Sequence, residues 1–397
     1  MQARVYDQVL REHLRQHRQM IFLSGPRQVG KTTSAKAVAA HYLNADVLED
    51  RRDILAGPRH LAARLGLDQL RKAKTVVALD EIHKLGTWKR ILKGFFDLYE
   101  DRASLLVTGS ARLEVFKKGG DSLMGRYLPY RMHPFSLGEL LDPGVPAGLW
   151  RRPRPVPAST WEDLQRLGGF PEPLLKGNAA FATAWRRLRS ERLLKEDLRD
   201  LSGLRDLSHV ELLAQALAAN SGKPVIYATL SRDLGAGLEN LRRWVATLTS
   251  LHYGFLVRPW FKSVRSSLRK EPKWYLRDWS GINDPGARAE TLVANALLKT
   301  AELFHDLGRG DFALHYLRDK QKREVDFLMV KDGKPWLMVE VKAGQEGLSP
   351  ALRYFADALK PAHALQANFG TKHVEADCFA AKGPMVVPAT SLLAQLV

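Results

Sequence analysis

The chain has 397 residues, which at roughly 150 residues per domain predicts two or three domains. Its 61 basic and 43 acidic side chains give a formal net charge of +18. That charge favours a polyanion such as nucleic acid, or an anionic membrane surface, although a generally basic proteome gives the same balance. The single cysteine, Cys378, excludes internal disulfides and a cysteine-rich zinc site. With no secretion signal after Met1 and no apolar run of about 18 residues, we expect a cytoplasmic protein that does not enter a membrane.

The positive charge is distributed unevenly along the chain. Residues 1–150 carry a net charge of +8, residues 151–300 carry +10, and residues 301–397 carry zero. The densest basic segment, residues 258–277, interleaves aromatic side chains with lysines and arginines, which suits phosphates and unpaired bases. A solvated hairpin with its aromatic side chains in a core would have the same sequence. The candidate DNA contacts in this segment are Lys262, Arg265, Arg269 and Lys270.

The first predicted strand, residues 20–24, runs into the sequence GPRQVGKT, and a helix-compatible segment follows over residues 32–42. Gly, four residues and Gly-Lys-Thr between a strand and a helix form a P-loop pattern. The glycines let backbone N–H groups approach phosphate oxygens, and the helix adds its positive N-terminal end. We expect Lys31 to contact the β- and γ-phosphates of ATP and Thr32 to ligate Mg²⁺. The predicted nucleotide-binding residues are Gly25, Pro26, Arg27, Gln28, Val29, Gly30, Lys31, Thr32 and Thr33.

A second buried strand, residues 75–79, leads directly into Asp80 and Glu81. Asp80 is expected to hold Mg²⁺, directly or through water. Glu81 is expected to orient and polarise the attacking water as a general base. The alternative is a polar strand end that caps the next helix.

A third strand, residues 104–108, ends close to these acids in a parallel sheet. Ser110 is our first choice for a polar group that senses the γ-phosphate, and Thr108 is the second. Arg126 lies on a later loop and is the candidate for reaching a neighbouring subunit's γ-phosphate. A purely structural arginine is the alternative at position 126. The competing arginines are Arg112 and Arg131.

Together these segments resemble a prokaryotic family of AAA+ ATPases. The resemblance is carried by GPRQVGKTT, LDEIHKLGTWKRILKGFFD, LLVTGSARLEVF and SLMGRYLPYRMHPFSLGELL, and later by GGFPEPLL, EPKWYLRDWSGI, REVDFL and VEVKAG. It implies an oligomeric ATPase, such as a hexamer, with ATP and Mg²⁺ as cofactors. It also implies a winged-helix region and a C-terminal domain that resembles the PD-(D/E)XK restriction-endonuclease-like fold. His83 stands where the family commonly has glutamine.

Two breaks in the pattern suggest domain boundaries. Residues 142–159 are rich in proline, and residues 278–286 are rich in turn formers. The alternation of strands and helices before the first break predicts a parallel α/β sheet. We therefore predict an α/β P-loop ATPase domain over residues 1–142, a helical and winged-helix domain over 160–283, and an α/β nuclease-like domain over 284–397.

The middle region predicts a winged helix. A helix, a turn at residues 235–237, a second helix from Leu238 and a strand over residues 253–257 follow one another. Arg242 and Arg243 lie on the second helix and are candidate DNA contacts. A protein-contact module is the alternative.

A helix over residues 287–303 and three strands over residues 312–317, 325–330 and 335–341 are predicted near the C-terminus. The Asp-Gly turn between the last two strands predicts a hairpin that brings Asp326 close to Glu340 and Lys342. Two carboxylates can hold a metal ion and the lysine can position water, as in metal-dependent nucleases. Glu290 is a third candidate acid. A decayed version of this site would keep the fold for binding or assembly.

Three functions follow from these motifs. The first is an ATP-driven machine that translocates, remodels, unwinds or branch-migrates single-stranded, duplex or branched DNA. The second is an ATP-gated, metal-dependent DNA nuclease, and the third is a slow ATP-dependent switch that recruits protein. His13 and His17 have a metal-like spacing, but no glutamate follows the first of them, so we expect both to be exposed.

Overall fold

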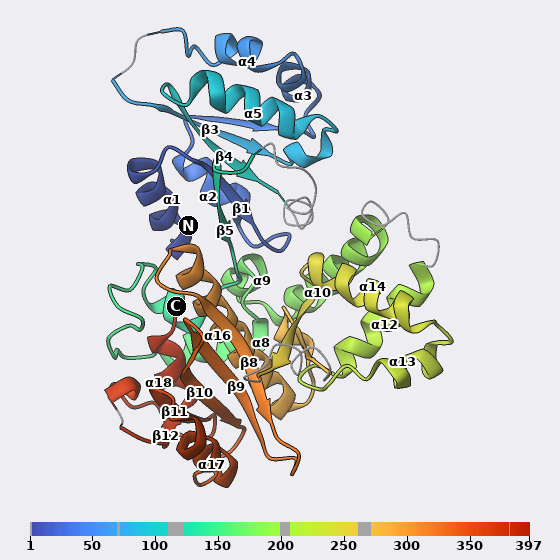
Figure 1. Cartoon of the computed structure of the whole chain (residues 1–397), viewed down its shortest axis with the longest axis vertical. Helices are drawn as coiled ribbons and strands as arrows, with labels where there is room; N and C mark the ends of the chain where they lie inside the picture. Colours follow the sequence, from blue (N-terminus) through green and yellow to red (C-terminus); the bar gives the residue numbers. More distant parts are fainter. Residues whose placement is uncertain (1, 70–71, 110–122, 199–206, 261–270, 381) are drawn as a thin grey trace. The chain divides into compact units, whose positions relative to one another are not determined.

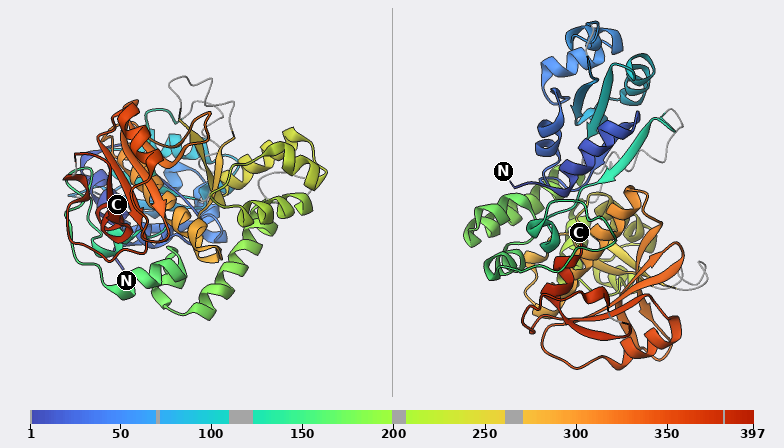
Figure 2. Two further views of the ribbon diagram at one scale, coloured as in Figure 1. Left: turned by 90° about the horizontal axis from the view of Figure 1, so that it is seen from below. Right: turned by 90° about the vertical axis from the view of Figure 1, so that its left-hand side faces the viewer.

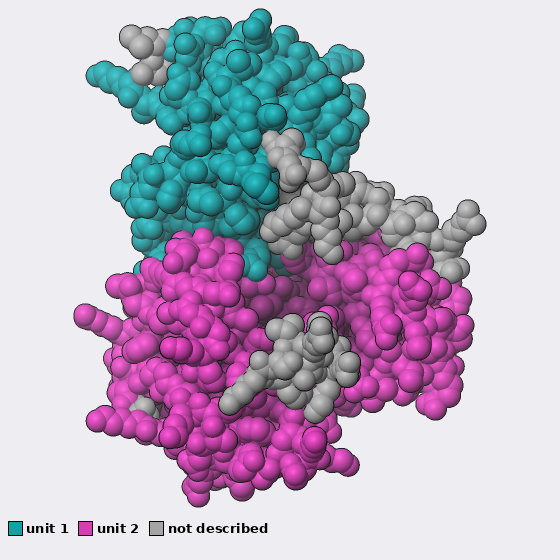
Figure 3. Space-filling view, in the orientation of Figure 1, with its two compact units in different colours: residues 1–133, 143–145 teal, residues 134–142, 146–397 magenta. Residues whose placement is uncertain are grey.

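The computed structural model describes residues 2–69, 72–109, 123–198, 207–260, 271–380 and 382–397. By its internal contacts the chain forms two compact units (Figure 3). Unit 1 comprises residues 1–133 and 143–145, and unit 2 comprises residues 134–142 and 146–397. Within the described ranges, no helix is both long and apolar enough to cross a membrane.

Unit 1 is built on a five-stranded parallel sheet in the order β2–β3–β4–β1–β5 (Figure 1), which confirms the predicted α/β class. The strands are β1 (Met20–Ser24), β2 (His41–Asn44), β3 (Thr75–Asp80), β4 (Ala103–Thr108) and β5 (Tyr127–Arg131). The helices are α1 (Val5–Gln16), α2 (Lys31–Val38), α3 (Leu48–Leu55), α4 (Pro58–Arg64), α5 (Trp88–Tyr99) and the 3₁₀ turn η1 (Ile82–Lys84).

Both faces of this sheet are buried, as its nearly continuous apolar strands predict. Met20 and Phe22 of β1 point into a core with residues of α3, α4 and α5. The alternating residues Ile21 and Leu23 are also fully buried, on the opposite face. With both faces covered, the polar residues that end β3 and β4 gather at the carboxyl edge of the sheet.

Unit 2 contains a seven-stranded mixed sheet in the order β12–β11–β10–β9–β8–β6–β7 (Figures 1 and 2). The strands are β6 (Gly254–Pro259), β7 (Lys273–Leu276), β8 (Phe312–Arg318), β9 (Glu324–Lys331), β10 (Lys334–Lys342), β11 (His363–Asn368) and β12 (Met385–Pro388). The longer helices are α8 (Ala158–Leu167), α10 (Ala179–Arg192), α12 (Leu207–Ala219), α13 (Tyr227–Leu234), α14 (Leu238–Ser250), α16 (Pro285–Asp306) and α17 (Pro350–Leu359). The shorter ones are α7 (Leu137–Leu141), α9 (Pro171–Lys176), α18 (Ala389–Gln395), η3 (Leu193–Asp197), η4 (Trp279–Gly281) and η5 (Cys378–Ala380).

The helical region and the C-terminal sheet are continuous within unit 2. Strand β6 pairs antiparallel with β7, and its last residues, Arg258 and Pro259, pair parallel with β8. Strands β6 and β7, which follow helices α12, α13 and α14, are therefore the edge of the C-terminal sheet. By contacts, the predicted second and third domains belong to one unit, and their separation at residues 283–284 stays a prediction.

Two local predictions were wrong. The helix expected over residues 32–42 ends at Val38, and Tyr42 lies in strand β2. His13 is buried, with its ring 2.9 Å from the hydroxyl of Tyr130 and 2.8 Å from the carbonyl oxygen of Gln19. The partner Tyr130 is 117 residues away, so local sequence gave no sign of this burial.

Candidate functional site

The P-loop begins at a glycine that no other residue can replace without a clash. Gly25 has φ +143°, and a Cβ atom there would lie 2.3 Å from the carbonyl oxygen of Met132. The loop then closes on Gly30, whose φ of 104° places it in the left-handed region at the N-cap of α2. The backbone thus follows the strand–loop–helix course that the motif predicts, with the N-terminus of α2 directed into the loop.

Lys31 lies inside this loop. It is 8% exposed, and its Nζ donates hydrogen bonds to the carbonyl oxygens of Gly25 at 2.8 Å and Pro26 at 2.7 Å. The side chain therefore folds back over the loop from the first turn of α2. A charged amine is held at the place where the motif requires a phosphate contact.

Asp80 is the centre of a hydrogen-bond network at the carboxyl edge of the sheet. Its Oδ2 accepts from Thr32 Oγ1 at 2.8 Å and from the Tyr42 hydroxyl at 2.6 Å. Its Oδ1 accepts from Thr108 Oγ1, the residue directly opposite it on β4. Three neighbouring elements, α2, β2 and β4, thus fix one carboxylate beside the P-loop.

The network keeps Asp80 ionised although the residue is only 5% exposed. Burial by itself raises the pKa of this carboxyl group. The hydrogen bonds from Thr108, Tyr42 and Thr32, and the charge of Lys31, outweigh burial and lower the pKa below its ordinary value. Burial and the bond to Asp80 also raise the pKa of the Tyr42 phenol.

Glu81 follows in an uncommon backbone conformation, with φ 54°. Its N–H donates to the Thr108 carbonyl oxygen at 3.1 Å and to Asp80 Oδ1 at 3.0 Å, which turns the chain at the strand end. Its carboxylate lies 3.6 Å from His83 Nε2 and 3.4 Å from Lys84 Nζ, and its side chain is 22% exposed. Glu81 is therefore accessible to a water molecule at the same edge of the sheet.

The arginine candidates lie at opposite ends of β5. Arg126 precedes the strand, accepts a hydrogen bond from the N–H of Met20, and forms an ion pair with Asp97 at 2.7 Å. Arg131 ends the strand in register with Ser24, next to the P-loop. Since β1 rises about 3.3 Å per residue, Arg126 is more than about 10 Å from its own P-loop. Ser110 and Arg112 lie outside the described residues, whereas Thr108 contacts Asp80 directly.

Two residues of this region were missed from the sequence. Tyr42 was assigned to a helix, so its contact with Asp80 was not foreseen. Arg4 is 6% exposed, and its guanidinium donates to the carbonyl oxygens of Val29 and His133, both at 2.6 Å. It therefore ties the P-loop to the exit of β5, and a lone arginine near the N-terminus gives no such signal.

The donor set at this edge fits a magnesium ion. The Thr32 hydroxyl and the Asp80 carboxylate are adjacent oxygen groups, and the low pKa of Asp80 keeps it in the form that binds a cation. Lys31 and Glu81 directly adjoin Thr32 and Asp80 in the sequence. The same edge thus contains the residue types needed for Mg-ATP.

The three helices of the predicted winged helix pack together and lead into the β6–β7 hairpin. Arg242 and Arg243 are exposed on α14, the second helix of the predicted helix–turn–helix pair. The Arg242 guanidinium lies 5.7 Å from the centre of the Tyr227 ring, beside a cavity of about 570 Å³ between α13, α14 and β6. The other basic candidates, Lys262, Arg265, Arg269 and Lys270, lie outside the described residues.

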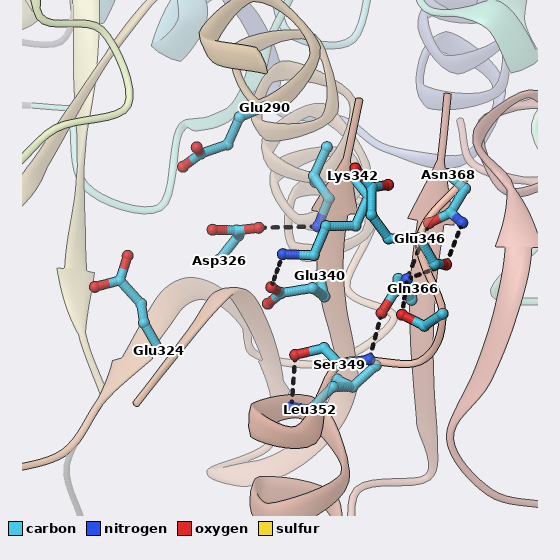
Figure 4. A network of polar contacts seen from close by, with 12 residues as sticks. Glu290, Glu324, Asp326, Glu340, Lys342, Glu346, Ser349, Leu352, Gln366 and Asn368 are labelled. Atoms are coloured by element: carbon cyan, nitrogen blue, oxygen red, sulfur yellow. Dashed lines mark hydrogen bonds and ion pairs between the residues drawn. The ribbon is translucent and has the colours of Figure 1, made fainter. Parts of the chain in front are cut away.

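The nuclease-like candidates do come together, on β9, β10 and α16 (Figure 4). Asp326 Oδ2 accepts a hydrogen bond from the N–H of Val341 at 2.8 Å, and Lys342 Nζ lies 2.8 Å from Glu340 Oε1. Glu290 projects toward Asp326 from α16 (Figure 4). Burial and the charges of Glu290 and Glu340 raise the pKa of Asp326 to about 8.

This cluster does not fit the metal ion that we predicted at Asp326 and Glu340. Lys273 of β7 enters it, with Nζ 3.0 Å from Glu290, 2.7 Å from Glu324 and 3.7 Å from Asp326. Within the part of the chain that the structure describes, no three His, Cys, Asp or Glu side chains are arranged to hold a metal ion. Sequence reasoning had placed Lys273 in a basic DNA-binding segment, so this role was missed.

Comparison with family models assigns three segments. Residues 17–141 match the model of an AAA domain. Residues 159–283 match a domain of unknown function, DUF8612, and residues 285–392 match another, DUF4143.

Similar proteins extend over most of the chain. Uncharacterised proteins of Mycobacterium tuberculosis and Mycobacterium bovis are each 25% identical over 349 residues, which is 84% of this chain and 73% of theirs. The ORC1 protein of Aeropyrum pernix, solved with DNA, aligns over 74% of this chain and 91% of its own at 15% identity and a TM-score of 0.32. A RuvB protein of Thermotoga maritima aligns over 62% and 85% at 16% identity and a TM-score of 0.28. Such TM-scores describe only a partial overlap of folds. The AAA-domain match covers the same residues as the complete P-loop and the Asp80 network, so residues 17–141 are similar to AAA-type P-loop ATPases.

Proposed function

We propose that unit 1 hydrolyses Mg-ATP. The observation that carries this proposal is the Asp80 network, which joins the P-loop threonine, the end of β3 and the end of β4 through one ionised carboxylate. Thr32 and Asp80 would hold Mg²⁺, which neutralises phosphate charge when it is bound. Lys31 binds the β- and γ-phosphates, and Glu81 accepts a proton from the attacking water.

Phosphate release from ATP tests this proposal. Lys31→Ala removes the amine that lies inside the loop and should abolish turnover. The matched control Lys36→Ala removes an exposed lysine from the same helix and should leave turnover close to that of the wild type. Equal activity of the two variants would refute the assignment.

We further propose that the active form is an oligomer in which Arg126 completes a neighbouring subunit's site. Arg126 lies at the amino end of β5, away from its own P-loop, which supports a role in trans over one at its own site. Its ion pair with Asp97 is at the surface and is weak enough to exchange for a phosphate contact. Mixing Arg126→Ala subunits with Lys31→Ala subunits should restore part of the activity, since each supplies what the other lacks. Activity that stays absent in every mixture would contradict a role in trans.

DNA is the partner that we propose for this ATPase. Arg242 and Arg243 are exposed side by side on α14, the helix that contacts DNA in helix–turn–helix proteins, and the net charge of +10 over residues 151–300 favours a polyanion. Translocation, remodelling and branch migration are the candidate actions.

Binding to duplex, single-stranded and forked DNA across salt concentrations tests this partner. Arg242→Ala/Arg243→Ala should weaken binding and reduce the slope of log K against log[salt] by about two, roughly one for each phosphate contact. The control Arg187→Ala/Arg192→Ala removes the same charge from exposed positions on α10. Equal losses of DNA affinity in both double variants would show that binding depends on the net charge of the chain and not on contacts made by Arg242 and Arg243. If none of these DNA forms changes the rate of ATP turnover, the result would favour the third function, a slow ATP-dependent switch that recruits protein.

A further inference from the structure

The acidic cluster of unit 2 contains a buried cation of its own. Four carboxylates converge there from three elements: Glu290 on α16, Glu324 and Asp326 on β9, and Glu340 on β10 (Figure 4). Lys273 is only 3% exposed, and its ammonium lies within ion-pair distance of the first three. The ammonium has three N–H donors, so it can bond Glu290 and Glu324 directly and still face Asp326.

The backbone around Lys273 holds its side chain in this place. Strand β7 pairs with β6, where Lys273 is opposite Val257. The residues beside it are fixed as well, since the Trp274 N–H donates to the Lys223 carbonyl oxygen at 3.0 Å. Tyr275, on the same strand, donates its hydroxyl hydrogen to Glu290 Oε1 at 2.7 Å. The backbone of β7 is thus fixed on both sides of Lys273, and withdrawal of its side chain would break the ion pairs with Glu290 and Glu324.

We propose that Lys273 supplies the positive charge of this carboxylate cluster in place of a divalent metal ion, so that the cluster fastens the β6–β7 hairpin to the C-terminal sheet. A buried carboxylate group needs a cation, and here the chain provides one from a different element. Strands β6 and β7 are then an anchored edge of the sheet. The C-terminal part of unit 2 acts as a scaffold, and DNA cleavage is not its function. This inference is independent of ATP hydrolysis in unit 1.

Manganese binding to the nucleotide-free full-length chain, measured by electron paramagnetic resonance, tests the proposal. The wild type and Asp326→Asn should bind the same amount of Mn²⁺, because the cluster takes none. Wild-type binding of one additional Mn²⁺ that Asp326→Asn removes would overturn the proposal.

Stability provides the second readout. Lys273→Met should lower the thermal midpoint, while the control Lys334→Met, at an exposed position of the same sheet, should not. Adding Glu290→Gln to Lys273→Met should recover part of the loss, since it removes one of the carboxylates left without a cation. A Lys273→Met variant as stable as the wild type, or no recovery on adding Glu290→Gln, would show that the lysine does not neutralise the cluster. If Lys273→Met does not fold, Lys273→Arg keeps the charge and should fold, and the Mn²⁺ comparison above remains decisive.

Discussion

The sharpest stability prediction concerns a fully buried ion pair in unit 2. Lys299 of α16 is 1% exposed at its side chain and Glu139 of α7 is 0% exposed, and the lysine Nζ forms an ion pair with the Glu139 carboxylate. The same Nζ donates to the Pro134 carbonyl oxygen at 3.1 Å and to Ser136 Oγ at 2.9 Å. One ammonium thus fixes the segment that directly follows the last strand of the ATPase sheet.

Lys299→Met would leave the Glu139 charge buried without its partner, which typically costs about 3–5 kcal/mol. The double variant Lys299→Met/Glu139→Leu removes both charges and should cost only about 2 kcal/mol, for the two acceptors that lose a donor. Hydrogen exchange of peptides from α16 measures the difference. Since 1.4 kcal/mol is a factor of ten, the single variant should exchange at least about 100-fold faster than the wild type. Exchange that is unchanged in the single variant, or faster in the double variant than in the single, would refute the reasoning.

Three further outcomes are expected. Tyr42→Phe removes a hydrogen bond to the charged Asp80 and should lower the free energy of unfolding of unit 1 by about 1–3 kcal/mol in urea denaturation. Gly25→Ala should abolish binding of a fluorescent ATP analogue, because its methyl group would overlap a backbone carbonyl, while Gly86→Ala, in open space, should bind normally. Because burial raises the pKa of Asp326 to about 8, the folded state holds a proton that the unfolded state releases above about pH 4. Urea stability should therefore fall between about pH 4 and pH 8, and Asp326→Asn should flatten that slope.

The motifs of unit 1 could be predicted because they are local in sequence. The strand, the glycines and the lysine of the P-loop are contiguous, and Asp80 directly follows a buried apolar run, so each was identified without knowledge of tertiary contacts. The order of the strands then places Thr108 opposite Asp80. Tyr42 was missed because a four-residue strand follows α2 after only two residues and continues its helix-compatible composition.

The residues that depend on long-range contacts could not be predicted. Lys273 was one lysine in a basic segment, and only the pairing of β6 with both β7 and β8 brings it to the carboxylates of β9 and α16. The spacing of Asp326 and Glu340 correctly placed them on neighbouring strands. Spacing does not show that the Lys273 ammonium lies beside Asp326, because that lysine comes from β7.

The most direct test of the ATPase assignment is a comparison of ATP binding and ATP turnover in Glu81→Gln. The amide retains the shape of the side chain but cannot accept the proton of the attacking water, so turnover should fall by at least about 100-fold. Binding of the nucleotide should stay within a few-fold of the wild type, since the P-loop and Asp80 are intact. Glu100→Gln, at a partly exposed position that pairs with Arg18, is the control. Turnover in Glu81→Gln equal to that of the wild type would contradict the proposed site.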